Sequence, residues 1–420
     1  VSLTLKKYFK IHHYLMPNIV NFIENIEETK NCLRECLDEF FNKKTLVLND
    51  TRLMIIPSVL PHIPFVGGYD QRVLPILKDT TVIFSKPFSE KTLHYYNSLG
   101  LSNNVDILQV DNIPEITLTE NILSDKDLVG KIRNKWFKRL INFWINENVE
   151  KLAESIGAKT LVSSEISNLA NNKLKLKQFL EKEWLPTVSG TYTSSPQIIT
   201  EYFNQTEHFF FKDPLGVSGY GFWSNKKNTL EEILTQYKGK ELIIEQVIEK
   251  EDSPSIQFCI YGEQEKKAVI FGFTDQILEW GQHYMGNTSP SKYCNEKDII
   301  DEFIRQSEII ITYLINIWYV WFGGIDFMIS TDKKVFATEV NARFTGATYP
   351  AISSFLLNNN LDTTWRYNTK EWLTESIEEY IDISIKQKDE YGLFPICIAP
   401  LESYGRAQLL FIWELDEHDL

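Results

Sequence analysis

Two carboxylates lie in the middle of neighbouring apolar stretches in GGIDFMISTDKKVFATEVNAR, residues 323–343. The stretches read as β-strands around a polar turn, and a turn centred on Asp332-Lys333 places Asp326 directly opposite Glu339. Opposed residues in an antiparallel pair have Cβ atoms about 4.5–5.5 Å apart. Two negative charges about 5 Å apart repel by roughly 3 kcal/mol at an effective dielectric constant near 20. We therefore expect a cation between them.

A third polar residue joins this pair. Side chains alternate between the faces of a strand, so Asn341, two residues after Glu339, lies on the face that carries both carboxylates. Three oxygen ligands suit Mg²⁺, which completes its shell with water and substrate phosphates, and Mn²⁺ is an alternative. A solvent-facing polar edge would need no metal. The flanking residues are almost all apolar or small, which favours a central hairpin and a metal site.

Arg343 follows Asn341 with the same two-residue spacing. A guanidinium at this position can hold a transferring phosphoryl group or an acyl phosphate through two parallel hydrogen bonds. A salt bridge to Asp326 or Glu339 is the alternative, and both arrangements can occur in turn.

A lysine and three glycines lie between two aromatic stretches in HFFFKDPLGVSGYGFW, residues 208–223. Glycines let backbone N–H groups close over phosphates, and Lys212 adds a positive charge. No GK[ST] sequence follows, so this is not a Walker A loop, and a loop between two strands would cover a nucleotide like a flap. A glycine-rich hairpin without a ligand explains the same residues.

In this order, the segments from about residue 160 to 350 resemble the ATP-grasp superfamily. EVNARFTG is similar to its E-x-N-x-R signature, and Asp326, Glu339 and Asn341 match its metal-binding spacing. Lys212 is similar to its phosphate-covering lysine. The loop residues for which the resemblance implies nucleotide contacts are Ser218, Gly219, Tyr220 and Gly221. The resemblance implies ATP and Mg²⁺ bound between two lobes, with Lys212 and Arg343 as catalytic residues.

Two further segments resemble nucleotide-binding parts of this family. NNKLKLKQFLEKEWLPTVSG is similar to a helix that carries an earlier nucleotide-contacting lysine, for which Lys173 fits best and Lys177 is the alternative. IIEQVIE is similar to the hinge that holds adenine, with Glu245 at the base edge and Gln246 and Ile248 around it. The candidates for the ribose-contacting acid are Glu249, Glu251 and Asp252, of which we select Asp252.

The organisation of the chain predicts an α/β fold with α+β lobes. Residues 1–115 alternate helix-like segments with short apolar runs, which indicates a mostly parallel sheet, and the resemblance identifies a pre-ATP-grasp domain. Within it, Gly67-Gly68 forms a tight turn or lets the backbone approach a ligand. The expected divisions are 1–115 for this domain, 116–159 for a helical linker, 160–240 for the small lobe with the glycine-rich loop, 241–352 for the large lobe with the metal-binding hairpin, and 353–420 for a C-terminal extension on the large lobe.

Trp136, Leu140 and Trp144 recur every four residues in KIRNKWFKRLINFW, residues 131–144. This spacing predicts an amphipathic helix with a basic outer face. A solvated helix surface is the ordinary interpretation, and a docking site for an acidic partner is the alternative.

The composition excludes several classes of protein. The hydrophobic content of 43% is that of a globular protein, and the net charge of −14 argues against a general nucleic-acid binder. No apolar run is long enough for a membrane span, and the first residues lack a signal peptide, so we expect a cytoplasmic protein. The five cysteines are expected to be free thiols, and they are Cys32, Cys36, Cys259, Cys294 and Cys397.

The resemblance implies that ATP phosphorylates a carboxylate and that an amine then displaces the phosphate. The chemistry agrees, because phosphoryl transfer between anions needs positive charge at the transferring group and no covalent protein nucleophile. Two alternatives stay open, a biotin-carboxylase-like enzyme that activates bicarbonate and a non-catalytic nucleotide-binding module. The segment TDQILEWGQHYMGNTSP should lie near the substrate, and its polar candidates are Asp275, Gln276, His283, Tyr284 and Asn287.

The expected subgroup contains peptide ligases of natural-product pathways, such as antibiotic biosynthesis, and amino-acid ligases that act on carrier-bound acyl chains. The implied partners are a small carboxylic acid, an amino acid or a peptide, with an acyl carrier protein and a homodimer both allowed.

Overall fold

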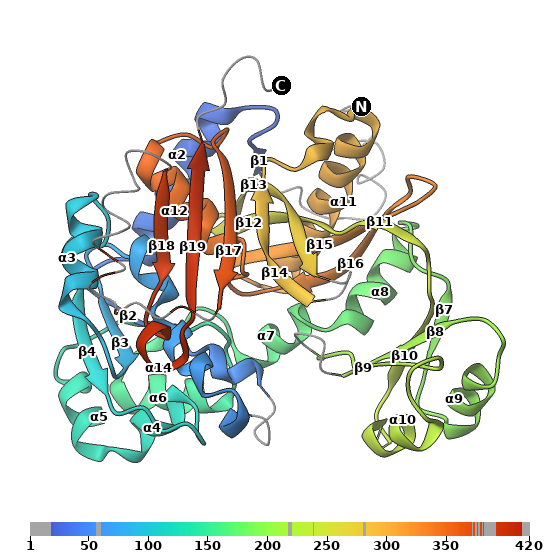
Figure 1. The fold of residues 1–420 in the computed structure, drawn as a ribbon, viewed down its shortest axis with the longest axis horizontal. Helices are drawn as coiled ribbons and strands as arrows, with labels where there is room; N and C mark the ends of the chain where they lie inside the picture. Colours follow the sequence, from blue (N-terminus) through green and yellow to red (C-terminus); the bar gives the residue numbers. More distant parts are fainter. Residues whose placement is uncertain are drawn as a thin grey trace.

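The computed structural model describes residues 18–55, 60–216, 221–237, 239–279, 283–371 and 392–413, with the single positions 373, 376, 379 and 381. Its strands form three sheets of ten, four and five strands. The four-stranded sheet stands apart from the other two, and helix α8 runs between it and the ten-stranded sheet (Figure 1).

The N-terminal sheet is parallel, in the order β4-β3-β2-β5-β6, as the sequence predicts. Strands β2 and β3 are buried at every residue, which is typical of a parallel sheet covered on both faces. The strands are β2 (Thr45–Leu48), β3 (Thr81–Ser85), β4 (Asp106–Val110), β5 (Arg139–Ile141) and β6 (Lys159–Thr160). The helices are α2 (Ile26–Phe40), α3 (Glu90–Ser98), α4 (Leu118–Ser124), α5 (Lys126–Arg133), α6 (Glu147–Ile156) and α7 (Ser164–Ala170).

Short 3-10 segments connect β2 to β3: η1 (Thr51–Met54), η2 (Leu60–His62) and η3 (Pro64–Ile76). Gly67 and Gly68 lie in η3, where a Cβ atom would come within 3.0 Å of Asn112 and of Pro400 respectively. The close backbone approach at these glycines is therefore to other parts of the chain itself.

The predicted helix over 131–144 is wrong. Helix α5 ends at Arg133, Trp136 has a left-handed backbone with φ of +57°, and the next residues form strand β5. Leu140 is buried because β5 pairs with β2 inside the parallel sheet, and the basic residues do not form one helix face. The segment 116–159, expected as a helical linker, thus also supplies strands to the N-terminal sheet.

The small lobe is an antiparallel sheet in the order β7-β10-β8-β9 with its own apolar core. Its elements are β7 (Gly190–Thr193), α9 (Pro196–Phe203), β8 (Phe209–Lys212), β9 (Phe222–Ser224), α10 (Leu230–Tyr237) and β10 (Leu242–Gln246). Helix α8 (Lys173–Lys182) precedes it, and the Asn172 side chain caps its first turn by accepting hydrogen bonds from two backbone N–H groups.

The large sheet follows the order β11-β15-β12-β13-β14-β17-β19-β18, with β1 paired to β13 and β16 paired to β15. Its strands are β1 (Asn18–Asn21), β11 (Lys250–Asp252), β12 (Pro254–Tyr261), β13 (Lys267–Glu279), β14 (His283–Ser289), β15 (Trp321–Ser330), β16 (Val335–Asn341), β17 (Thr364–Lys370), β18 (Leu393–Cys397) and β19 (Ala407–Trp413). The associated helical elements are η4 (Lys292–Asn295), α11 (Lys297–Asn316), α12 (Thr348–Asn358) and α14 (Leu401–Tyr404).

The C-terminal residues extend this sheet. Two apolar segments of the C-terminal region, FPICIAP and AQLLFIW, contribute to strands β18 and β19, which run antiparallel. Lys370 is the last residue of strand β17, and most of the residues from 372 to 391 lie outside the described part of the chain. All five cysteines belong to the described part of the chain and are free. Among the described residues, no helix is both long enough and apolar enough to cross a membrane.

The hairpin of β15 and β16 pairs Asp326 with Glu339, as predicted. The turn differs from the prediction, because it is centred on Asp332 and closes with a 3.0 Å hydrogen bond from the Ser330 N–H to the Lys334 carbonyl. A one-residue bulge at Thr338 then shifts the register and restores the predicted pairing. The two carboxylates therefore oppose each other directly next to the bulge.

A candidate nucleotide and metal site

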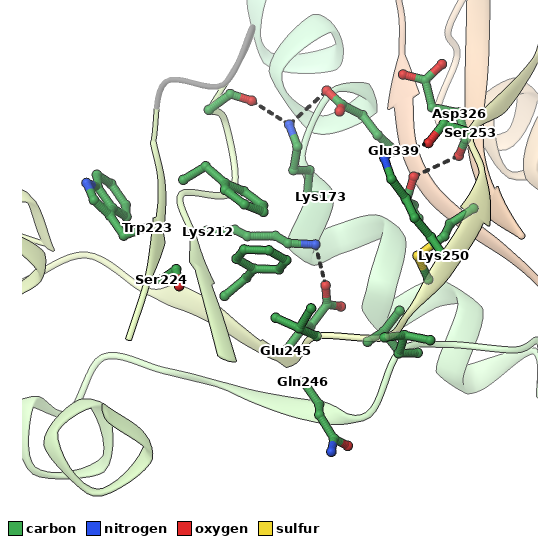
Figure 2. Close-up of a pocket in the computed structure, with 18 of the residues that line it drawn as sticks. Lys173, Lys212, Trp223, Ser224, Glu245, Gln246, Lys250, Ser253, Asp326 and Glu339 are labelled. Atoms are coloured by element: carbon green, nitrogen blue, oxygen red, sulfur yellow. Dashed lines mark hydrogen bonds and ion pairs between the residues drawn. The ribbon is translucent and has the colours of Figure 1, made fainter. Parts of the chain in front are cut away.

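A cavity of about 700 Å³ lies where the small lobe faces the large sheet. The small lobe lines it with side chains of β8, β9 and β10, and the large sheet lines it with the β15–β16 hairpin (Figure 2). Of the predicted site residues, those that line the cavity are Lys173, Lys212, Gly221, Glu245, Gln246, Ile248, Gln276, Asp326 and Glu339.

Glu245 joins two lysines at one side of the cavity. Its carboxylate accepts hydrogen bonds from Lys177 Nζ at 2.9 Å and from Lys212 Nζ at 2.6 Å. Burial raises the pKa of Glu245, but the charges of Lys212 and Lys177 outweigh this effect, so its pKa is lower than usual. Lys177 also lies 3.7 Å from Glu181, so the positive charge that faces the cavity is that of Lys212, which can attract phosphate.

Lys173 connects the glycine-rich loop to the β15–β16 hairpin. Its Nζ donates to Glu339 Oε1 at 2.8 Å and to the Gly216 carbonyl at 2.5 Å (Figure 2). It is the first residue of helix α8, and its N–H also donates to the Pro214 carbonyl at 2.9 Å. Lys173 therefore lies closer to the opposed carboxylates than Lys177, which was the sequence alternative.

The loop that follows Lys212 is described only at its two ends. Ser218, Gly219 and Tyr220 lie outside the described residues. Gly221 has a φ of +79°, and a Cβ atom there would be 2.9 Å from the Cβ of Asp213. Only glycine satisfies both conditions without strain.

Asp326 and Glu339 are the core of the candidate metal site. Burial and the nearby charge of Glu339 raise the pKa of Asp326 to about 7. Carboxylate oxygens that face each other in this way fit a hard divalent cation such as Mg²⁺. In the described part of the chain, no three His, Cys, Asp or Glu side chains are grouped closely enough to hold a metal, so phosphate and water oxygens would complete its shell.

Asn341 and Arg343 lie directly beside this pair. The Asn341 amide donates to Asp326 Oδ2 at 2.9 Å, and its oxygen accepts a hydrogen bond from Arg343 Nη2. The oxygen that was expected to bind the metal therefore contacts Arg343 in this structure. Arg343 is buried over the ring of Phe143, and its Nε has no hydrogen-bond partner among the described residues.

The hinge is partly as expected. Gln246 and Ile248 line the cavity, although Gln246 points away from the Lys212–Glu245 pair (Figure 2). Asp252, selected for the ribose, does not line it and pairs with Lys292 at 2.7 Å. The neighbouring candidate Glu251 accepts from Lys333 and Tyr293.

Sequence reasoning missed several residues that line the cavity. From β11 and the bend after it come Lys250 and Ser253, and from β8 and β9 come His208, Phe210 and Phe222. The rings of Phe210 and Phe222 are 4.4 Å apart and form an apolar wall. The alternation of His208, Phe210 and Lys212 is a signal that could have identified this face of the strand.

The substrate candidates fall into separate groups. Gln276 lines the cavity. Asp275 accepts from the Ser291 hydroxyl at 2.6 Å and the Lys292 N–H at 2.8 Å, a structural arrangement. The Tyr284 hydroxyl donates to Asn287, whose amide donates to Thr274 at 3.2 Å. The side chain of His283 lies outside what the structure describes.

Comparison with known proteins bears on the fold of the chain. Solved structures similar to the chain include an N5-carboxyaminoimidazole synthetase from Staphylococcus aureus, with 12% identity, 89% of this chain and 95% of that chain covered, and a TM-score of 0.55. An L-amino acid ligase from Bacillus licheniformis has 14% identity, 90% and 95% coverage, and a TM-score of 0.55. A biotin carboxylase from Campylobacter jejuni, solved as a complex with a β-γ-ATP ligand, has 11% identity, 90% and 89% coverage, and a TM-score of 0.56.

No curated protein matches the sequence. Residues 170–347 match the family described as ATP-grasp domain, and this range spans Lys173, Lys212, Glu245 and the β15–β16 hairpin. The chain therefore contains an ATP-grasp domain and has the ATP-grasp fold.

Proposed function

We propose that the protein is an ATP-dependent ligase that activates a carboxylate as an acyl phosphate and joins it to an amine. One observation carries this proposal: two opposed carboxylates, Asp326 and Glu339, share a cavity with the ammonium groups of Lys173 and Lys212. Acidic oxygens for a divalent cation and lysines for phosphates are the groups that phosphoryl transfer needs.

The residues of the cavity divide the binding of ATP between them. Lys173 and Lys212 would bind phosphate oxygens, with Glu245 holding Lys212 in position. The hinge from Gln246 to Ile248 and the apolar wall of Phe210 and Phe222 would contain the adenine. Mg²⁺ bound by Asp326 and Glu339 would neutralise charge on the β- and γ-phosphates.

The reaction then needs two displacements. A carboxylate oxygen of the acid attacks the γ-phosphorus, and the bond from that phosphorus to ADP breaks. The amine nitrogen attacks the acyl carbon of the acyl phosphate, the bond to phosphate breaks, and the nitrogen loses a proton. Arg343 would hold the oxygens of the transferring group, and no protein atom becomes covalently attached.

ADP release tests the proposal directly. Small acids and amino acids, alone and in pairs, are incubated with ATP and Mg²⁺, and condensed products are identified by mass. Release that needs both an acid and an amine supports a ligase. Release driven by bicarbonate alone would indicate a carboxylase, and nucleotide binding without turnover would indicate a binding module.

Lysine variants connect the activity to the cavity. Lys212→Met is expected to abolish ADP release, because it removes the positive charge beside the phosphates. Lys240→Met is the matched control, since Lys240 lies on the small lobe with 66% of its side chain exposed and is 3.9 Å from Asp213. Equal activity in the two variants would contradict the assignment of the cavity.

A further inference from the structure

Arg72 lies next to the ATP-grasp domain without an acidic partner. It belongs to segment η3, is half-buried, and donates from Nε to the Tyr69 carbonyl at 3.3 Å. Its guanidinium carbon is 5.1 Å from the ring centre of Tyr69 and 4.9 Å from that of Tyr349. In the described part of the chain, Arg72 forms no ion pair. A guanidinium that is largely removed from water normally pairs with an anion.

The contact with Tyr349 places Arg72 near Arg343. Tyr349 lies at the start of helix α12, six residues after Arg343, and its hydroxyl donates to Asn49 of the N-terminal domain at 2.7 Å. Burial raises the pKa of Tyr349 to about 12, while the charges of Arg72 and Arg343 both act to lower it. The Tyr349 ring thus contacts Arg72 on one side, and it also packs against Phe344, the neighbour of Arg343, with 5.2 Å between the ring centres.

Tyr284 contacts the segment between Arg343 and helix α12. Its hydroxyl fits against Gly346, where a Cβ atom would be only 2.1 Å from the hydroxyl oxygen. Tyr284 is 41% exposed, but its hydroxyl end is enclosed, and this raises its pKa, which the charge of Arg72 acts to lower and that of Asp326 to raise. Gly346 lies between Arg343 and Tyr349 in the sequence, so Tyr284 and Tyr349 both belong to the surroundings of the segment that follows the β15–β16 hairpin.

We propose that Arg72 binds a substrate carboxylate other than the one that is activated. This inference rests on the proposed ligase function and names the substrate class of the same site. The planar guanidinium matches a carboxylate through two parallel hydrogen bonds. Such a second carboxylate belongs either to a dicarboxylic acid or to an amino acid that supplies the amine.

Paired probes distinguish these two sources. Succinate is compared with butyrate as the acid, and alanine with ethylamine as the amine, in calorimetric titrations of the protein saturated with Mg²⁺ and ADP. The parent is expected to prefer the member of one pair that carries the additional carboxylate, by on the order of tenfold to a hundredfold. Arg72→Ala should abolish this preference, and Arg72→Lys should retain part of it.

Arg34→Ala is the matched control, because Arg34 also lies over an aromatic ring of α12, that of Phe355 at 5.3 Å. It should leave the preference unchanged. A parent without any preference, or a preference that survives Arg72→Ala, would overturn the proposal. Saturation by ADP is measured first on the parent, so a failure of the nucleotide site is recognised separately.

A second observation concerns four tryptophans in backbone conformations that glycine normally takes. The φ angles are +57° at Trp136, +56° at Trp184, +67° at Trp318 and +150° at Trp321. Positive φ angles are unfavourable for side chains of this size. Trp184 and Trp318 are 85% and 72% exposed, so packing does not compensate there. Trp321 is buried, and its indole N–H lacks a partner among the described residues.

Two of these tryptophans end helices in the way that glycine does elsewhere in the chain. The N–H groups at and after Trp184 donate to carbonyls three and five residues earlier, at 3.2 and 2.9 Å, and those at and after Trp318 do so at 2.9 Å each. This is the Schellman motif, whose left-handed position is usually glycine. Gly157 makes the same pair of hydrogen bonds after α6, at 3.0 and 2.8 Å.

We infer that the protein made in its source cells carries glycine at these four positions. The codon UGA is read as tryptophan in some genetic codes and as glycine in others. A UGA codon at each of these positions would therefore give tryptophan in the printed sequence and glycine in the protein that the cells make. Peptide masses of the protein isolated from those cells test the inference. Glycine masses at positions 184 and 318 are expected, and tryptophan masses there would overturn it.

Discussion

Glu245 tests how the charges of the small lobe are held together. The side chains of Lys177 and Glu245 are only 6% and 12% exposed, and their charged atoms are 2.9 Å apart. Glu245→Gln removes the negative charge and leaves the Lys177 ammonium with the Val188 carbonyl, at 2.6 Å, and with the partly exposed Glu181 carboxylate, at 3.7 Å. Breaking a buried ion pair by removing one partner costs about 3–5 kcal/mol. Because the carbonyl bond remains, we expect a loss near the lower value, about 3 kcal/mol.

The pH dependence separates the effect of charge from that of shape. Burial raises the pKa of Glu245, but Lys212 and Lys177 lower it further, so its folded pKa lies below the ordinary value of 4.5. A carboxyl group of this kind stabilises the fold above its unfolded pKa and loses that contribution as the pH falls through its folded pKa. The difference in the free energy of unfolding between parent and variant should therefore be largest near neutral pH and shrink in acid.

Urea unfolding followed by circular dichroism measures this difference at about pH 7 and about pH 4. A double variant with Lys177→Met provides the coupling energy. In the double variant only the ammonium of Lys212, whose side chain is 19% exposed, loses its carboxylate, so the double variant should lose less stability than the sum of the two single losses. Additive losses, or a difference that does not change with pH, would refute the charge argument.

The remaining predictions concern the opposed carboxylates, the arginine and one buried acid. Glu339→Ala should abolish ADP release, because it removes a metal ligand. It should change the melting temperature in metal-free buffer only a little, because it also relieves repulsion from Asp326. A large drop in melting temperature would show that the pair is structural. Arg343→Ala should reduce kcat more than ATP affinity, and equal losses would assign it to ground-state binding. Burial raises the pKa of Asp70 to about 7, above its ordinary value of 3.8, so parent stability should fall as the pH rises from about 4 to about 7, by at most about 1.4 kcal/mol per pH unit. Asp70→Asn should flatten that dependence in urea unfolding, and an unchanged slope would contradict the assignment.

The hairpin shows what sequence patterns can determine. Alternation placed Asp326 and Glu339 on one face, and the structure confirms their pairing. The predicted turn was displaced by half a residue, and the bulge at Thr338 compensated for the displacement. A bulge leaves no mark in an apolar–polar pattern, so the agreement rests partly on two deviations that cancel.

The segment after α5 shows the opposite case. A spacing of four residues between tryptophans predicted a helix, whereas Trp136 ends the helical region and Leu140 is buried in a strand. Helix ends are recognised in a sequence by glycine or asparagine in the left-handed position. Tryptophan at that position concealed the end of α5, and the same applies to the residues that follow α8 and α11.

The hinge and the ribose candidate depended on tertiary contacts that spacing does not contain. Glu245 was predicted to bind the base edge, but its carboxylate accepts from two lysines that are 33 and 68 residues away in the sequence. Asp252 was chosen among three acids by position alone, and Lys292, which pairs with it, comes from a different element. Choosing among neighbouring acids requires knowledge of which cations the fold brings to each.

The charges of the cavity indicate how a cation and a nucleotide would share it. Lys173 pairs with Glu339, and Arg343 contacts Asn341 beside Asp326. A divalent cation at the two carboxylates would take over the role of Lys173 at Glu339, and the released ammonium would then be available to a phosphate. The cation would replace Lys173 as the partner of Glu339, and the nucleotide would give the released Lys173 ammonium a new partner. Cation and nucleotide would therefore bind more tightly together than separately.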